Sequence, residues 1–302
     1  MTASAIASQD LTKFYGQVRG IEKLDLRIDQ GEVFGLLGPN GAGKTTTIRL
    51  LLDLIRPTRG QVTILGRDCH RESLAVRRSI GYLPGEFNLY ENLTGRQLLT
   101  YLGSLRGGFD FTFVDTLVEL LGAAYDRQIS TLSHGNKQKL ALIQAFAPQP
   151  EVLILDEPTN GLDPLVRQVF HELVREARSQ GRTVFLSSHD LTEVEKTCDR
   201  IASVRDGRLI AVESVSALRE SAMRIVYLEC AHPLSPHPFD HLPSVDQLKI
   251  DGCHLHCRVR GPLGPLLAAA ARFEILDVLS REPHLEEFFL ALYGKQENNN
   301  AR

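Results

Sequence analysis

The sequence lacks tryptophan, an excess of basic residues and any long hydrophobic run. The formal net charge of its 302 residues is −3, so the chain has no basic field for a phosphate backbone, and we expect no nucleic-acid partner. No apolar stretch approaches the ~18 residues that cross a bilayer, and the first ten residues lack the basic-then-apolar order of a signal peptide. These absences predict a cytoplasmic chain.

Cysteine is also scarce. The five cysteines are odd in number and mostly scattered, which is typical of reduced thiols and not of a disulfide framework. Only the segment Cys253-His-Leu-His-Cys257 suggests a metal. Strand alternation would put its two cysteines on one face and its two histidines on the other, whereas zinc needs donors that converge. We therefore expect core thiols behind a solvated face.

What the sequence does contain is a regular alternation of strand and helix patterns. Hydrophobic residues make up 43% of the chain and charged residues 24%, as in a globular protein with room for one large and one small domain. The β-type runs span 32–37, 61–65, 151–155, 183–187 and 200–204. Those at 151 and 183 are almost wholly apolar, which indicates strands buried on both faces of a parallel sheet. The pattern predicts an α/β fold.

One region inside this alternation is purely helical. Residues 94 to 148 predict three consecutive helices, the second behind an Asp110 cap, with no strand between them. We interpret the region as a helical insertion spanning about 86–149.

The C-terminal part of the chain predicts a separate small α+β unit. It contains β-type runs at 224–229 and 253–259, a proline-rich loop and two helical stretches. The last helix carries an apolar stripe of Leu285, Phe288, Phe289 and Leu292. The predicted domains are therefore 1–218 and 219–294, with a disordered tail at 295–302.

A glycine-rich segment follows the first buried run and opens a helix. It comprises Gly38, Pro39, Asn40, Gly41, Ala42, Gly43, Lys44, Thr45 and Thr46. This is the P-loop pattern in the strand-to-helix context that validates it. Its backbone amides can surround phosphate oxygens beside the helix N-terminus. Lys44 would neutralise the β- and γ-phosphates, and the Thr45 hydroxyl would bind Mg²⁺.

Two carboxylates follow the buried run at 151–155. Asp156, at the end of the strand, is placed to hold Mg²⁺ directly or through water. Glu157 is the better general base, because it can reach a water in line with the γ-phosphate. Two acids after a strand are often only a solvated turn, but the P-loop upstream favours the chemical interpretation.

A second candidate phosphate cradle lies at Leu132-Ser-His-Gly-Asn136. Ser133 can cap the helix that follows, so its hydroxyl, the Gly135 amide and the helix dipole would together face a phosphate. A plain helix N-cap is the alternative.

These motifs together resemble the ATP-binding subunit of an ATP-binding cassette (ABC) transporter, from residue 5 to about 215. The segment at 132–136 is similar to the family's Leu-Ser-Gly-Gly-Gln signature, with His134 and Asn136 in place of a glycine and the glutamine. The resemblance implies a P-loop NTPase (RecA-like) core with an antiparallel β subdomain and a helical insertion. It also implies ATPase activity with ATP and Mg²⁺.

The resemblance assigns further residues. Tyr15 would stack on adenine, a use of an aromatic face that competes with simple packing. Ser133 and Gly135 would act on the nucleotide of a second subunit, in a head-to-tail dimer with two ATP molecules at its interface. Asp163 matches the loop that crosses between subunits, and His189 matches the histidine that contacts the γ-phosphate and holds the attacking water near Glu157.

The loop at Pro84-Gly-Glu86 departs from the family pattern. The family ordinarily carries glutamine directly after the proline, where it contacts Mg²⁺ or the water, but here that position is Gly85. Glu86 could bind the metal in place of the glutamine, or it could only face solvent. A glycine also makes this hinge freer.

The function predicted from these features is ATP binding and hydrolysis in an ABC transporter. Subfamily features favour an exporter: Gly81 to Pro84, the Ser-x-Gly-Asn-Lys-Gln-Lys segment and Leu285 to Leu290 resemble multidrug and antibiotic exporter ATPases. The expected partners are a second ATP-binding subunit, as a homodimer, and transmembrane permease subunits that hold the chain at the inner face of the membrane. A non-transport ABC mechanoenzyme and an ATP-binding regulatory protein are the alternatives.

Overall fold

The computed structural model describes residues 3–221, 223–239 and 241–281, and the chain divides into two compact units. Unit 1 spans Met1–Glu213 and unit 2 spans Ser214–Arg302, and each is described by itself. The domain boundary predicted after residue 218 falls inside helix α8 (Val215–Ser221). The apolar stripe of the last predicted helix and the predicted tail at 295–302 lie outside the described residues.

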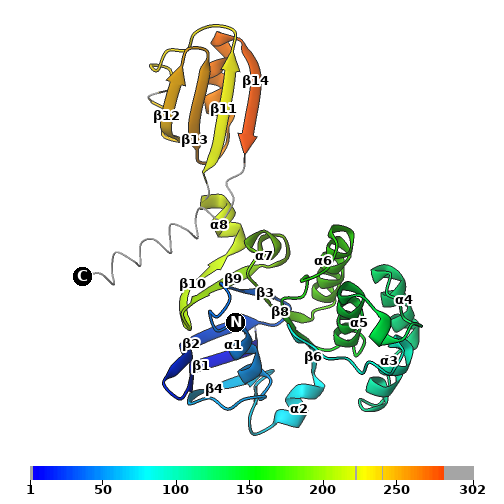
Figure 1. Cartoon of the computed structure of the whole chain (residues 1–302). Coiled ribbons are helices and arrows are strands. Elements are labelled where there is room, and N and C mark those ends of the chain that lie inside the picture. The colour runs from blue at the N-terminus through cyan, green and yellow to red at the C-terminus, as the bar shows by residue number, and fades with distance from the viewer. Residues whose placement is uncertain (1–2, 222, 240, 282–302) are drawn as a thin grey trace. The chain divides into compact units, whose positions relative to one another are not determined.

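The centre of unit 1 is a six-stranded sheet in the order β10-β9-β3-β8-β7-β6 (Figure 1). The strands are β3 (Val33–Leu37), β6 (Ile80–Leu83), β7 (Val152–Asp156), β8 (Thr183–Ser188), β9 (Arg200–Arg205) and β10 (Arg208–Ser214). The pairs β6/β7, β7/β8, β3/β8 and β3/β9 are parallel, so their carboxyl ends share one edge. Every residue of β3, β7 and β8 is buried, as their apolar sequences predict for strands covered on both faces.

A second, antiparallel sheet in the order β2-β1-β4-β5 completes the core of unit 1. It contains β1 (Ser4–Tyr15), β2 (Val18–Asp29), β4 (Arg59–Ile64) and β5 (Arg67–Asp68), and α2 (Ser73–Arg78) follows. Leu11, Leu24 and Ile64 of this sheet belong to one hydrophobic cluster with Phe34 of β3 and Ile48 of α1 (Lys44–Leu51). The two sheets thus share one core, and the P-loop helix packs in it.

The helical insertion comprises α3 (Gly95–Ser104), α4 (Phe111–Leu121), the short 3₁₀ helix η1 (Ile129–Thr131) and α5 (His134–Phe146). Each α-helix begins at a polar cap. Thr94 and Gln97 form a reciprocal capping box, and Asp110 accepts from two backbone amides of α4, which confirms the predicted Asp110 cap. Outside the insertion, α6 (Pro164–Ser179) packs against β8, and α7 (Leu191–Thr197) packs against β3 and β8.

Unit 2 is an α+β unit around an antiparallel sheet in the order β12-β13-β11-β14. Its elements are β11 (Arg224–Cys230), β12 (Val245–Asp251), β13 (His254–Val259), α9 (Gly264–Ala270), η2 (Ala271–Phe273) and β14 (Ile275–Arg281). Val226, Leu228, Leu255 and Cys257 are buried with Leu266 of α9. Strands β12 and β14 were not predicted, because polar residues interrupt their apolar runs.

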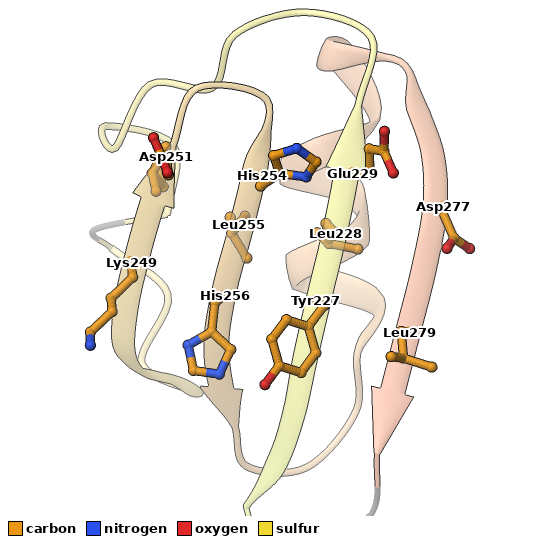
Figure 2. A pocket seen from close by; sticks show the side chains of 11 residues that line it. Tyr227, Leu228, Glu229, Lys249, Asp251, His254, Leu255, His256, Asp277 and Leu279 are labelled. Atoms are coloured by element: carbon orange, nitrogen blue, oxygen red, sulfur yellow. The ribbon is translucent and has the colours of Figure 1, made fainter.

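The other face of this sheet is hollowed by an open cavity of about 660 Å³. Figure 2 shows its lining side chains, among them Tyr227, His256 and Leu279. The rings of Tyr227 and His256 lie 4.6 Å apart. His254 is exposed and His256 half-buried while Cys257 is buried, which is the alternation predicted for residues 253–257. Over 3–281, apart from 222 and 240, no helix is long and apolar enough to span a bilayer.

Candidate functional site

The P-loop joins β3 to α1 at the carboxyl edge of the six-stranded sheet. Leu37 ends the buried strand, and α1 begins at Lys44. Gly43 precedes α1 at φ 105°, where a Cβ would lie 2.6 Å from Ile21 Cγ2 and 2.8 Å from the carbonyl oxygen of Gly20. Only glycine fits this left-handed and crowded position, so the loop can turn tightly into the helix N-terminus, where backbone amides attract anions.

The Lys44 side chain is buried and points back into the loop. Its Nζ donates to the carbonyl oxygens of Gly38 at 2.6 Å and Pro39 at 3.3 Å. The same Nζ lies 3.1 Å from Glu157 Oε1. That oxygen accepts no hydrogen bond within the described ranges, so the contact is an ion pair without hydrogen-bond geometry. The Glu157 carboxylate therefore balances the charge of the Lys44 ammonium without holding it by a hydrogen bond.

Asp156 ends β7 and is buried, with 1% of its surface exposed. Thr45 Oγ1 donates to Asp156 Oδ2 at 2.9 Å, and Ser187 Oγ donates to Oδ1 at 2.5 Å. The carboxylate is thus held by the P-loop on one side and by β8 on the other. A buried carboxylate next to a threonine hydroxyl is an oxygen set that suits Mg²⁺.

Glu157 follows at once, in the left-handed region at φ 49°. This conformation costs a residue with a side chain about 1–2 kcal/mol. Ser187 holds it in place, because the Glu157 amide donates to the Ser187 carbonyl at 3.2 Å and to Ser187 Oγ at 3.1 Å. The turn points the two adjacent carboxylates in different directions, with Asp156 toward Thr45 and Glu157 toward Lys44.

His189 follows β8 and meets the second oxygen of Glu157. Its Nδ1 lies 2.7 Å from Glu157 Oε2, and the ring is more than half exposed, at 56%. A carboxylate paired with an imidazole can accept a proton and keep it in a fixed place. The structure therefore brings together five of the predicted site residues: Lys44, Thr45, Asp156, Glu157 and His189.

Ser187 is a site residue that the sequence analysis missed. It is fully buried, and its hydroxyl contacts both Asp156 and the Glu157 amide. The signal was the pair of serines that ends the otherwise apolar strand Thr183–Ser188, since a hydroxyl buried in a parallel sheet needs a partner.

A buried carboxylate lies beneath the loop that carries His189. Glu193 Oε2 accepts from Ser188 Oγ at 2.8 Å, and Ser188 Oγ in turn accepts from the Asp190 amide at 3.0 Å. Burial raises the pKa of Glu193, opposed by hydrogen bonds from Thr159 and Ser188. These contacts tie the His189 loop to Thr159, which lies two residues beyond Glu157.

At the carboxyl end of β6, Gly85 and not Glu86 adjoins the site. A Cβ at Gly85 would lie 3.2 Å from both Cγ and Oδ2 of Asp156. The Glu86 side chain is exposed and makes no hydrogen bond or ion pair with any residue that the structure describes. A metal role for Glu86 stays a prediction, and its exposure supports the alternative in which it faces solvent.

Tyr15 lies beside the start of α1 with nearly half of its surface exposed, at 45%. A Cβ at Gly20 would lie 2.9 Å from Tyr15 Cε2 and 3.1 Å from Thr46 Cγ2, so the ring and the Thr46 methyl group flank the same glycine. Lys13 Nζ is 5.3 Å from the ring centroid. The exposed ring face next to the P-loop helix leaves the adenine role as a prediction with suitable geometry.

Ser133, of the second predicted cradle, and Asp163, of the predicted crossing loop, each cap a helix. Ser133 caps α5 by accepting from the Asn136 amide at 3.4 Å, and Asp163 caps α6 by accepting from the Leu165 and Val166 amides. The Val166 amide is the main cause of a lowered pKa at Asp163. Both side chains are exposed. Among described residues, no hydrogen bond or ion pair links them to the P-loop.

Comparison with known proteins gives relatives that match nearly the whole chain. A protein-family model described as ABC transporter matches residues 21–160. The bacitracin transport ATP-binding protein BcrA of Bacillus licheniformis is 33% identical over 97% of this chain and 98% of its own length. A Nod factor export ATP-binding protein I of Paraburkholderia xenovorans is 35% identical, with 98% and 99% covered.

Solved structures match the larger part of the chain. A structure described as an ATP-binding subunit of an ABC transporter is 31% identical, with a TM-score of 0.66, over 72% of this chain and 92% of its own. A bacterial Atm1-family ABC exporter with ATP bound is 25% identical, with a TM-score of 0.64, over 72% of this chain and 40% of its own. These matches confirm the predicted α/β P-loop fold with its antiparallel subdomain.

Proposed function

The chain belongs to the ABC transporter family as an ATP-binding subunit with ATPase activity, and from that premise we propose that it powers an exporter by hydrolysing ATP between two copies of itself. The observation that carries the proposal is the cluster at the carboxyl edge of the sheet in which Glu157 contacts both Lys44, at 3.1 Å, and His189, at 2.7 Å. Each of these side chains has a separate task in phosphate-ester hydrolysis.

Lys44 binds the β- and γ-phosphates. In the structure its ammonium contacts two carbonyl oxygens and one carboxylate oxygen. The phosphates of ATP carry several negative charges against the single charge of the Glu157 carboxylate, so they attract the ammonium more strongly. Arrival of the phosphates draws Lys44 away from Glu157, and the carboxylate is then released to act as the base.

Glu157 accepts the proton of the attacking water. The Ser187 contacts fix its backbone, and His189 contacts the oxygen that Lys44 does not. His189 thus holds the carboxylate and contacts the γ-phosphate. Because both Glu157 oxygens already face charged or polar groups, the base is oriented before the substrate binds.

The residues present fit a magnesium ion. Asp156 and Thr45 would hold it, and the missing side chain at Gly85 leaves space beside Asp156 Oδ2. Mg²⁺ supplies positive charge that neutralises the phosphate oxygens. Ser187 keeps the Asp156 carboxylate in the orientation that this requires.

The exposed helix starts supply the other half of each nucleotide site. Ser133, Gly135 and Asp163 face the ATP of a second copy in a head-to-tail dimer, and Tyr15 stacks on the adenine of the chain's own ATP. Their support is the exposure of Ser133 and Asp163 at helix starts and of the Tyr15 ring beside α1.

The transport role follows from the relatives, whose names specify bacitracin transport and Nod factor export. We propose that dimer closure drives export through separate permease subunits, which hold this chain at the inner face of the membrane. The helical insertion would transmit the closure to them.

The experiment that tests the function compares Glu157→Gln with the wild-type chain. The amide cannot accept the proton, so we expect hydrolysis to fall by about 10²-fold or more while ATP binding persists and a dimer accumulates in size-exclusion chromatography with Mg²⁺-ATP. Glu172→Gln, an exposed position on α6, is the matched control. Full activity of Glu157→Gln would overturn the base assignment.

A further inference from the structure

His134 contacts two loops of its own unit from the start of α5. It is the first residue of that helix, and it stands where the family signature has glycine. Its imidazole is exposed to solvent, yet it lies against Gly161 on one side and Phe87 on the other. A glycine at this position could make neither contact.

The contact with Gly161 leaves no room for a side chain there. A Cβ at Gly161 would lie 2.6 Å from His134 Cδ2 and 3.1 Å from His134 Nε2, distances that real Cβ atoms avoid or tolerate only with displacement. Gly161 has φ 75°, which glycine adopts without strain. Close by, a Cβ at Gly135 would lie 3.0 Å from the Gly161 carbonyl oxygen. The N-terminus of α5 and residues 160–163 are therefore closely packed, with the His134 ring against the Gly161 backbone.

The contact with Phe87 reaches the loop after β6. The two rings are stacked, with centroids 6.2 Å apart and planes within 12° of each other. Phe87 lies two residues beyond Gly85, which adjoins the Asp156 carboxylate. This stacking holds the loop after β6 against the start of α5.

Both loops that touch His134 lead directly to the catalytic carboxylates. The Gly161 loop starts at Glu157, and the Asn160 amide donates to the Glu157 carbonyl at 3.1 Å. A second link from α5 runs in parallel, because buried Gln138 Nε2 donates to the Pro158 carbonyl at 2.9 Å. A ring contact and a hydrogen bond therefore both join α5 to the loop that follows Glu157.

We propose that His134 is a positioning residue that couples Ser133 and Gly135 to Glu157 and to the Gly85 loop of the same chain. The proposal deepens the proposed function and rests on it, since it assumes that Ser133 and Gly135 face the nucleotide of a second copy. Engagement of that nucleotide shifts α5, and His134 carries the shift to the base that serves the chain's own nucleotide.

A suppressor pair tests the ring contact. Gly161→Ala places a Cβ against the His134 ring, and we expect kcat for ATP to fall about tenfold with KM changed less than about twofold, because the P-loop is untouched. Gly181→Ala is the matched control, since Gly181 has φ 79° and nothing within 4 Å of its Cβ position. Adding His134→Gly to Gly161→Ala removes the clash but also the positioning contact, so kcat should rise to that of His134→Gly alone, about threefold below that of Gly181→Ala.

Two results would overturn the proposal. One is a Gly161→Ala variant as active as Gly181→Ala, and the other is a double variant as impaired as Gly161→Ala alone. A wild-type chain without ATP binding or hydrolysis would instead overturn the proposed function.

A second measurement does not depend on activity. The amides of Asn160 and Leu162 donate hydrogen bonds within the loop after Glu157, and hydrogen exchange reports their local opening. In nucleotide-free His134→Gly we expect both amides to exchange at least about threefold faster than in the wild-type chain, with Leu153 and Phe185 amides in the buried strands unchanged. Identical exchange at Asn160 and Leu162 would show that His134 does not hold this loop.

Discussion

Unit 1 has two candidate phosphate-binding ends, and they differ in how far the chain itself satisfies their polar groups. At the P-loop end, Lys44 and Asp156 are buried and contact other parts of the same chain. At the other end, Ser133 and Asp163 are exposed, and their side chains accept hydrogen bonds from residues at the start of their own helices. The polar groups of the first end are therefore satisfied within the chain, whereas those of the second are exposed to solvent.

The difference separates binding from turnover. In the proposed dimer, a single chain holds the phosphates of ATP with residues of the P-loop end alone, and a second copy adds the helix-start donors of its open end. We therefore expect hydrolysis to depend on both ends and binding to depend on one. Substitutions at the two ends should therefore change different measured quantities.

The largest expected effect comes from blocking the open end with Ser133→Phe. The substitution removes the hydroxyl that caps α5, and the new ring fills the place where phosphate would approach. We therefore expect hydrolysis to fall by about 10²-fold. ATP binding by the monomer should stay within about twofold of the wild-type value, because no P-loop residue changes. Binding is measured by titration with a fluorescent ATP analogue, and hydrolysis by phosphate release.

The conservative variant Ser133→Thr is the control for this substitution. Threonine keeps the hydroxyl and caps helices nearly as well, so hydrolysis should be largely retained. If Ser133→Phe abolishes ATP binding by the monomer, the two ends are not separate and the role of Ser133 on a second copy is wrong.

A smaller effect is expected from Ser187→Ala at the P-loop end. Loss of the hydroxyl removes the donor to Asp156 Oδ1 and one acceptor of the Glu157 amide. We therefore expect kcat to fall about tenfold and the free energy of unfolding to fall by about 1–3 kcal/mol. The Mg²⁺ concentration for half-maximal activity should rise. Chemical denaturation and Mg²⁺ titrations measure the two quantities.

Ser203→Ala is the matched control for that variant. Ser203 is equally buried, 1% exposed, but its Oγ has no hydrogen-bond partner in the part of the chain that the structure describes. Removing an unpartnered hydroxyl should leave stability unchanged or slightly higher. Equal losses in Ser187→Ala and Ser203→Ala would mean that the Asp156 and Glu157 contacts of Ser187 contribute nothing.

The two ends also differ in how well the sequence predicts them. The P-loop and the paired carboxylates follow apolar strands whose carboxyl ends share one sheet edge, so spacing along the chain was enough to bring Lys44, Asp156 and Glu157 together. The contact between His134 and Gly161 could not be predicted in this way. It joins two loops across the fold, and its only signal was a histidine in place of a glycine.

The same limit applies to Ser187 and to unit 2. The role of Ser187 depends on its register opposite Asp156, which pairing between β7 and β8 sets and no local pattern reveals. In unit 2, the strands at 224–230 and 254–259 alternate clearly, but β14 is exposed along most of its length. An edge strand with little buried surface carries almost no periodic signal, so only its pairing with β11 identifies it.

The smallest expected effect, from Glu86→Ala, tests whether the P-loop end is complete without the loop after β6. Because the Glu86 side chain is exposed and Gly85 is the residue beside Asp156, we expect ATPase activity and Mg²⁺ dependence to change less than about twofold. Gly85→Ala is the comparison, since its Cβ would lie 3.2 Å from Asp156 Oδ2 and must displace the carboxylate slightly. It should therefore lower activity more than Glu86→Ala does. If the Mg²⁺ concentration for half-maximal activity instead rises tenfold in Glu86→Ala, Glu86 takes the role of the missing glutamine. The P-loop end would then depend on a side chain that reaches the metal only when nucleotide is bound.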